Sequence, residues 1–130
     1  MSSESLHAPR EILTAETRLL HNAIASLKEE LDAVDWYRQR ADDTEDEALK
    51  GLLLHNMREE MEHAAMLLEW IRRNNGDFDE HIKTYLFSKG SILGVEKAAT
   101  QAEAAGGGSG NGGTSGGASP FTIGSLKERR

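Results

Sequence analysis

The chain has 130 residues, of which 38% are apolar, 28% charged and 5% aromatic, so it holds one domain at most. It contains no cysteine, which excludes disulfides, thiolate metal sites, iron–sulfur clusters and a cysteine nucleophile. A formal net charge of −7 disfavours nucleic acids and anionic membranes as partners and attracts cations. No apolar run approaches the ~20 residues that span a bilayer, and the N-terminus has no signal-peptide pattern, so we expect a cytoplasmic protein.

Composition divides the chain into four segments. Residues 1–8 are predicted to be a disordered N-terminus, and residues 9–105 are predicted to form the helical domain. Residues 106–119 consist mostly of glycine and serine and are predicted to be a flexible linker. Residues 120–130, with the sequence PFTIGSLKERR, become apolar again. Because eleven residues cannot fold alone, we expect another protein to bind this segment.

Apolar residues at helical spacing predict a first long helix, which we expect to begin near Pro9. Its apolar positions recur in steps of three and four residues, as in helix-on-helix packing. They are Leu20, Ile24, Leu27, Leu31 and Val34. Asp42, Asp43 and Thr44 mark the following turn, and Thr44 with Glu47 resembles a capping box.

A second long helix is predicted from about Glu45 to Asn74, ending at the C-cap signal Asn74-Asn75-Gly76. Shorter helices are expected over about Phe78–Phe87 and residues 92–103, separated by Gly90. The expected fold is all-α: an antiparallel hairpin of two long helices, followed by the short C-terminal helices. A hairpin buries only one side, so we predict that two chains pack together and complete a four-helix bundle. The alternative is a monomeric bundle closed by the third helix.

A glutamate lies within the apolar stripe of the second helix. At about 100° per residue, Glu60 falls among five apolar side chains. They are Leu53, Met57, Ala64, Leu67 and Ile71. A buried, unpaired carboxylate costs several kcal/mol (~5), and His63 follows on the same face. Glu-x-x-His on a bundle helix is a ligand pair for iron or manganese. Two alternatives are a salt bridge from Glu60 to an arginine and a core packing role for His63. The salt bridge is disfavoured because neither long helix has a Lys or Arg in its apolar seam.

The first helix offers a further ligand. Glu30 lies at the flank of the apolar seam, and Tyr37 lies two turns further on, where its hydroxyl could reach a ligand carboxylate or a metal. The alternatives are that Glu30 is a solvated charge and that Tyr37 is a half-buried packing residue. A di-iron bundle uses a Glu from each of two helices and a Glu-x-x-His from each of the other two. One chain therefore supplies half a site, and dimerisation would complete it.

Other polar residues carry weaker signals. Glu29 and Asp32, near Trp36, form either an acidic patch that collects Fe²⁺ or an ordinary solvated helix face. The histidines outside the motif lack carboxylate partners at suggestive spacing, and we assign them no role. They are His7, His21, His55 and His81.

Several stretches of the chain resemble encapsulated ferritins. These stretches are Lys28–Tyr37, Arg58–Met66, Leu68–Arg73 and Thr84–Phe87. The segment Phe121–Leu126 is similar to the targeting peptide that docks cargo inside encapsulin shells, with Phe121 where leucine is frequent. The resemblance covers nearly the whole chain outside the linker.

The resemblance implies roles for individual residues. Glu30, Glu60 and His63 match ferroxidase ligands, and Tyr37 matches a tyrosine near that centre. A secondary metal site through which iron enters is implied by a further set of positions. They are Glu29, Asp32 and Trp36, with Asp32 where glutamate is common.

The expected function is oxidation of Fe²⁺ to Fe³⁺ by O₂ or peroxide at a di-iron centre holding two Fe per dimer. The family resemblance further implies an annular decamer of five dimers and storage of the iron inside an encapsulin nanocompartment. No nucleic-acid or membrane partner is expected. Two alternatives are a non-catalytic oligomeric adaptor recruited to a shell and a manganese or peroxide-handling di-metal protein.

Overall fold

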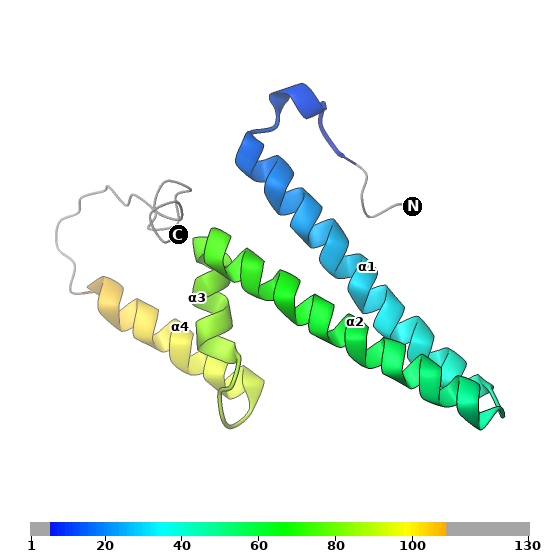
Figure 1. Ribbon diagram of the computed structural model, residues 1–130. Coiled ribbons are helices and arrows are strands. Elements are labelled where there is room, and N and C mark those ends of the chain that lie inside the picture. Colours follow the sequence, from blue (N-terminus) through cyan, green and yellow to red (C-terminus); the bar gives the residue numbers. More distant parts are fainter. Residues whose placement is uncertain (1–5, 109–130) are drawn as a thin grey trace. The chain divides into compact units, whose positions relative to one another are not determined.

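The computed structural model describes residues 6–108, and its regular structure in this range is helical (Figure 1). A 3₁₀ turn, Arg10–Ile12, precedes four α-helices. These are α1 (Ala15–Asp43), α2 (Glu47–Asn74), α3 (Gly76–Tyr85) and α4 (Ile92–Gly108). The predicted all-α class, with a long hairpin and short C-terminal helices, is confirmed. The predicted targeting segment, residues 120–130, and most of the linker lie outside the described residues.

The first long helix begins at Ala15, six residues after its predicted start near Pro9. Pro9 precedes the 3₁₀ turn, and Leu13 and Thr14 are extended. The Oγ1 of Thr14 accepts a hydrogen bond of 3.0 Å from the backbone N–H of Thr17, so Thr14 is the N-cap of α1. The Arg18 side chain donates to the Leu13 carbonyl at 2.6 Å and fixes this entry into the helix.

The predicted capping box of Thr44 and Glu47 is not formed at the start of α2. The hydroxyl of Thr44 accepts from the backbone N–H of Asp46 at 3.2 Å, which forms a turn rather than a helix cap. Asp46 Oδ1 accepts from the N–H of Leu49 at 2.8 Å. Asp46 is therefore the residue that caps α2, and the helix begins at Glu47 instead of Glu45.

The chain divides into two compact units after Ile71, and the first contains the hairpin of α1 and α2. Its buried side chains are mostly small or flexible, which allows the helix backbones to approach closely. They are Ala23, Ala25, Ala41, Met57, Ala64 and Ile71. Larger apolar side chains of both helices stay exposed: Leu31, predicted in the packing seam, is 54% exposed, and Met61 is 47% exposed. One hairpin thus leaves much of its apolar surface uncovered.

The second unit begins at the end of α2. Asn75 and Gly76 do not form the predicted C-cap: the Asn75 side chain accepts from the N–H of Phe78 at 2.9 Å and is the N-cap of α3. Gly76 is the first residue of α3, which therefore starts before Phe78. The helix ends at Tyr85, and the connection that follows holds Phe87 and Gly90 at φ 62° and 84°. Gly90 tolerates this left-handed backbone, as expected for a break.

A buried carboxylate organises the start of this unit. Asp79, 5% exposed, pairs with the Arg72 guanidinium at 2.6 Å and with the Lys83 ammonium at 3.0 Å. The i,i+4 spacing of Asp79 and Lys83 was visible in the sequence, but the pairing with Arg72 depends on the turn between α2 and α3.

Replacing Asp79 by Ala is expected to lower the free energy of unfolding by about 3 kcal/mol, because two cations lose their buried partner. Chemical denaturation of the full chain measures the change. The matched control is D77A, which removes an exposed carboxylate from the first turn of the same helix. Equal losses in the two variants would contradict a structural role for the Asp79 ion pairs.

None of the helices within residues 6–108 combines the length and the apolar character that crossing a membrane requires.

Candidate metal centre

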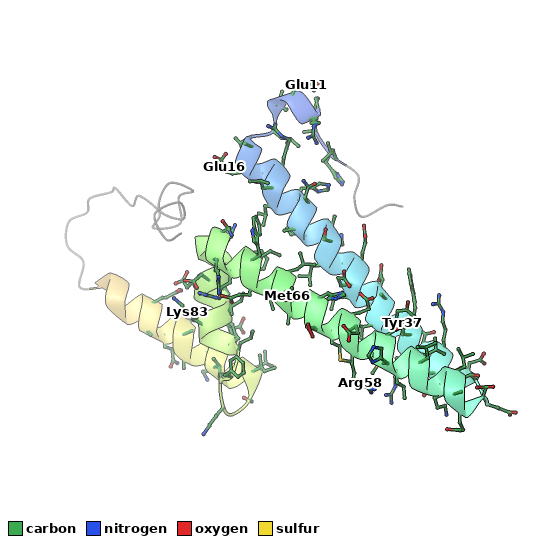
Figure 2. All side chains as sticks on the ribbon, in the orientation of Figure 1. Glu11, Glu16, Tyr37, Arg58, Met66 and Lys83 are labelled. Atoms are coloured by element: carbon green, nitrogen blue, oxygen red, sulfur yellow. The ribbon has the colours of Figure 1, made fainter. Side chains whose placement is uncertain are left out.

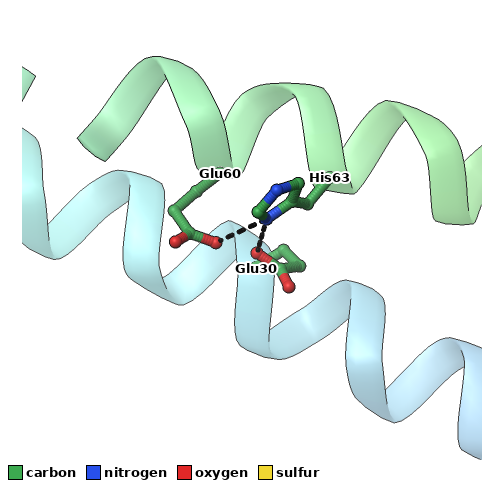
Figure 3. A group of neighbouring side chains, drawn as sticks. All are labelled: Glu30, Glu60 and His63. Carbon is green, nitrogen blue, oxygen red and sulfur yellow. Dashed lines mark ion pairs between the residues drawn. The ribbon is translucent and has the colours of Figure 1, made fainter. Parts of the chain in front are cut away.

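Three of the predicted ligands meet between the two long helices. Glu30 comes from the middle of α1, and Glu60 and His63 come from successive turns of α2 (Figure 3). The Nδ1 atom of His63 lies 3.4 Å from Glu60 Oε2 and 3.5 Å from Glu30 Oε2. One ligand atom from each residue lies within 4.8 Å of the other two. The structure therefore brings together residues separated by thirty positions in the sequence.

The three side chains differ in exposure. About a quarter of the Glu30 and Glu60 side chains is exposed, against 45% for His63. Glu60 is therefore half-buried in a single chain, whereas its place in the apolar stripe predicts full burial. The Oε2 atom of Glu30 is buried and makes no well-formed hydrogen bond with a described residue, since its pairing with His63 Nδ1 at 3.5 Å is long. A buried acceptor that is so weakly satisfied is unfavourable and is a reason to look for a cation partner.

The three groups change one another's proton affinity. The pKa of Glu30 is raised, first by its hydrogen bond with Glu60 and then by burial and the Glu60 charge, while His63 works in the opposite direction. Desolvation lowers the pKa of His63, but the hydrogen bond to Glu60 and the charges of both carboxylates outweigh it and leave this pKa raised. Without a metal ion, the cluster therefore tends to hold protons.

The donor set fits a first-row divalent metal. Two carboxylates and one imidazole suit iron, manganese or zinc, and the chain has no cysteine that would favour softer metals. Bonds of about 2.0–2.2 Å to nitrogen and oxygen, as in zinc sites, separate ligand atoms by up to about 4.4 Å. The separations seen here, 3.4 and 3.5 Å, lie within that range.

Metal binding at this cluster is expected to release protons and to strengthen as pH rises from about 6 to 8. The reason is that the ion needs the deprotonated forms of groups whose pKa values are raised, Glu30 and His63. The affinity should rise by up to about tenfold per pH unit for each proton released. Calorimetric titration with Mn²⁺ in two buffers of different ionisation enthalpy counts these protons. Affinity independent of pH would contradict the assignment of these ligands.

The other predicted site residues are not part of this cluster. Glu29, Asp32 and Trp36 are exposed on α1. Within residues 6–108, Glu30, Glu60 and His63 are the single group of three such ligand side chains at this spacing. Tyr37 is half-buried, and the Arg40 guanidinium lies 5.6 Å from the centre of its ring.

One histidine pairing was missed. His55 Nε2 lies 3.5 Å from Glu59 Oε1, although His55 was expected to lack a carboxylate partner. The i,i+4 spacing on a helix is the signal that predicts this pair. Both side chains are about half exposed or more, and the pair offers two ligands rather than three. It serves below as a matched control.

A model of the EncFtn-like family matches residues 5–89. The chain belongs to the EncFtn-like family. An encapsulated ferritin-like protein of Rhodospirillum rubrum is 51% identical over 126 residues, which cover 97% of this chain and 90% of that relative. The resemblance to encapsulated ferritins noted in the sequence is thereby confirmed.

Two further comparisons extend the EncFtn-like assignment. An encapsulin nanocompartment cargo protein of Myxococcus xanthus is 36% identical over 75 residues, covering 58% of this chain and 56% of that protein. The crystal structure of a protein from Nitrosomonas europaea, 52% identical, matches with a TM-score of 0.66 over 68% of this chain and 97% of that one. The EncFtn-like helical architecture is therefore shared with a solved structure.

Proposed function

We propose that the protein is a ferroxidase that oxidises Fe²⁺ to Fe³⁺ at a di-iron centre shared by two chains. The observation that supports this proposal most is that Glu30 of α1 lies beside Glu60 and His63 of α2 (Figure 3). A di-iron helical bundle needs two Glu helices and two Glu-x-x-His helices, and one chain supplies one of each. A second copy would supply the remainder and cover exposed apolar side chains of α1 and α2. Membership of the EncFtn-like family supports the same proposal.

Each ligand has a proposed role. Glu30, Glu60 and His63 of each chain would hold the Fe²⁺ substrate, the carboxylates supplying negative charge and the imidazole a neutral nitrogen ligand. Each Fe²⁺ gives up one electron, so a pair of ions matches the two-electron reduction of O₂ to peroxide, which takes up two protons. Deprotonated carboxylates favour Fe³⁺ over Fe²⁺ because they place negative charge beside the more highly charged ion.

Residues around the centre have proposed supporting roles. Tyr37 lies on α1 two turns from Glu30, and we propose that it acts close to the iron. Three exposed residues of α1 are proposed to collect iron on its way to the centre. They are Glu29, Asp32 and Trp36.

The second part of the proposal concerns location. A relative is a nanocompartment cargo protein, another is called encapsulated, and the segment Phe121–Leu126 resembles a cargo peptide. We propose that this segment binds an encapsulin shell and that the protein works inside the nanocompartment, in the cytoplasm. The shell stores the Fe³⁺, and the cargo assembles as a dimer and then an annular decamer.

Aerobic addition of Fe²⁺ to the purified full chain tests the proposed reaction. Fe³⁺ absorbance and O₂ consumption, followed together, should show oxidation much faster than in buffer. A manganese or peroxide-handling protein would bind metal but turn over Fe²⁺ poorly in air. A non-catalytic adaptor would neither bind metal stoichiometrically nor accelerate oxidation, and either result would overturn the proposal.

A further inference from the structure

Three of the four methionines of the chain lie in a short stretch of α2 that also holds two of the proposed metal ligands. They are Met57, Met61 and Met66. Met57 precedes Glu60 by three residues, and Met66 follows His63 by three residues. Residues three apart on a helix are surface neighbours, with Cβ atoms about 5–6 Å apart. The side chains of Met57 and Met66 therefore each lie beside a ligand.

The three methionines differ in exposure and in direction. Met57 is buried, at 8% exposure, whereas Met61 is 47% and Met66 62% exposed. Met61 directly follows Glu60, and adjacent residues point about 100° apart around a helix, so Met61 does not face the ligand pair. Met66, in the second half of α2 (Figure 2), is the one of the three that is both exposed and beside a ligand.

The proposed reaction supplies an oxidant for this sulfur. Two Fe²⁺ ions reduce O₂ to hydrogen peroxide with the uptake of two protons, and peroxide converts a methionine thioether to the sulfoxide. The Met66 sulfur attacks one peroxide oxygen, and the O–O bond breaks as the S–O bond forms. The departing hydroxide takes up the proton of the transferred oxygen and leaves as water. The sulfur loses two electrons in this step, and the peroxide gains them.

We propose that Met66 is a modification site, at which hydrogen peroxide released from the metal centre oxidises the thioether to methionine sulfoxide. One chain consumes one peroxide in this way, and a methionine sulfoxide reductase would restore the thioether. The sulfoxide also places a polar group one helical turn from His63, so the modification records turnover on the helix that carries the ligands. The inference rests on the proposed ferroxidase reaction.

Peptide mass spectrometry after aerobic oxidation of Fe²⁺ by the full chain tests the inference, with catalase present to remove peroxide that escapes into the solvent. The reference is the same protein treated with hydrogen peroxide without iron, which measures how accessible each methionine is in the assembled protein. The chain provides two internal controls: Met61 is exposed but faces away from the ligands, and Met57 is beside a ligand but buried. His63→Ala with the same amount of Fe²⁺ controls for oxidation by iron in solution.

During turnover, the ratio of sulfoxide at Met66 to sulfoxide at Met61 should be about fivefold higher than in the reference, because the peroxide forms one helical turn from Met66. This excess should be absent in H63A, and Met57 should stay the least modified of the three. Equal ratios in turnover and reference, or the same excess in H63A, would overturn the inference.

Fe³⁺ absorbance recorded in the same samples separates the two proposals. Unmodified Met66 with rapid Fe³⁺ formation would overturn this inference alone. Absence of Fe³⁺ formation would overturn the proposed function, and the inference with it.

Discussion

Glu60→Ala and His63→Ala are each expected to slow Fe²⁺ oxidation by more than about 100-fold. Loss of even an indirect partner of a metal ligand typically costs 10–100-fold, and these residues are proposed as direct ligands. The structure gives the physical reason: both side chains contribute ligand atoms to one cluster with Glu30, and either loss leaves two ligands per chain. Stopped-flow absorbance of Fe³⁺ formation measures the rate, and circular dichroism reports whether the helices remain.

The matched controls for these variants are His55→Ala and Glu59→Gln. They disrupt a second His–Glu pair on the same helix, at a distance of 3.5 Å, that belongs to no three-ligand cluster within residues 6–108. Both controls should oxidise iron at close to the wild-type rate. Wild-type rates in E60A and H63A, or equal losses in the control variants, would show that the cluster is not the site of oxidation.

Deletion of residues 120–130 is expected to abolish loading into a co-expressed encapsulin shell and to leave the oxidation rate of the free protein unchanged. The reason is that the ligand cluster lies on α1 and α2, whereas the apolar segment proposed as a cargo peptide follows the glycine-rich stretch in the sequence. Co-purification of the cargo with intact shells measures loading. A finer variant changes only the apolar side chains of the peptide to serine: Phe121, Ile123 and Leu126.

The two variants separate recruitment from catalysis. Serine replacements keep the length and the basic residues of the segment, so their loss of loading would place recognition on the apolar side chains. Retained loading after the deletion would contradict the assignment of the targeting peptide. Slower oxidation by the deleted protein would contradict the separation of the two functions along the chain.

The candidate cluster was predictable because both of its elements leave a strong sequence pattern. Glu60 stands out as a carboxylate within an apolar stripe, and its spacing from His63 is a known ligand spacing on one helix. The contact of Glu30 with this pair, 3.5 Å from His63, depends on the register of the hairpin, which periodicity does not fix. Glu30 was therefore identified by its flank position and by the count of missing ligands.

The helix ends were harder to predict because short polar residues compete for the same backbone groups. The sequence pattern predicts Thr44 as the cap of α2, but Asp46 accepts the capping hydrogen bond, and Thr44 forms the turn before it. Asn75 signals a C-cap and an N-cap equally well. It caps α3 because the chain enters that helix at once, without a loop.

The central claim is that two chains together bind two iron ions, which native mass spectrometry tests most directly. Titration with Fe²⁺ without oxygen, followed by mass measurement of the intact assemblies, counts metal ions and chains at once. The account predicts two iron ions for every pair of chains in the wild type and none in E60A dimers. Wild-type dimers without iron at any Fe²⁺ concentration, or one complete di-iron site in a single chain, would contradict it.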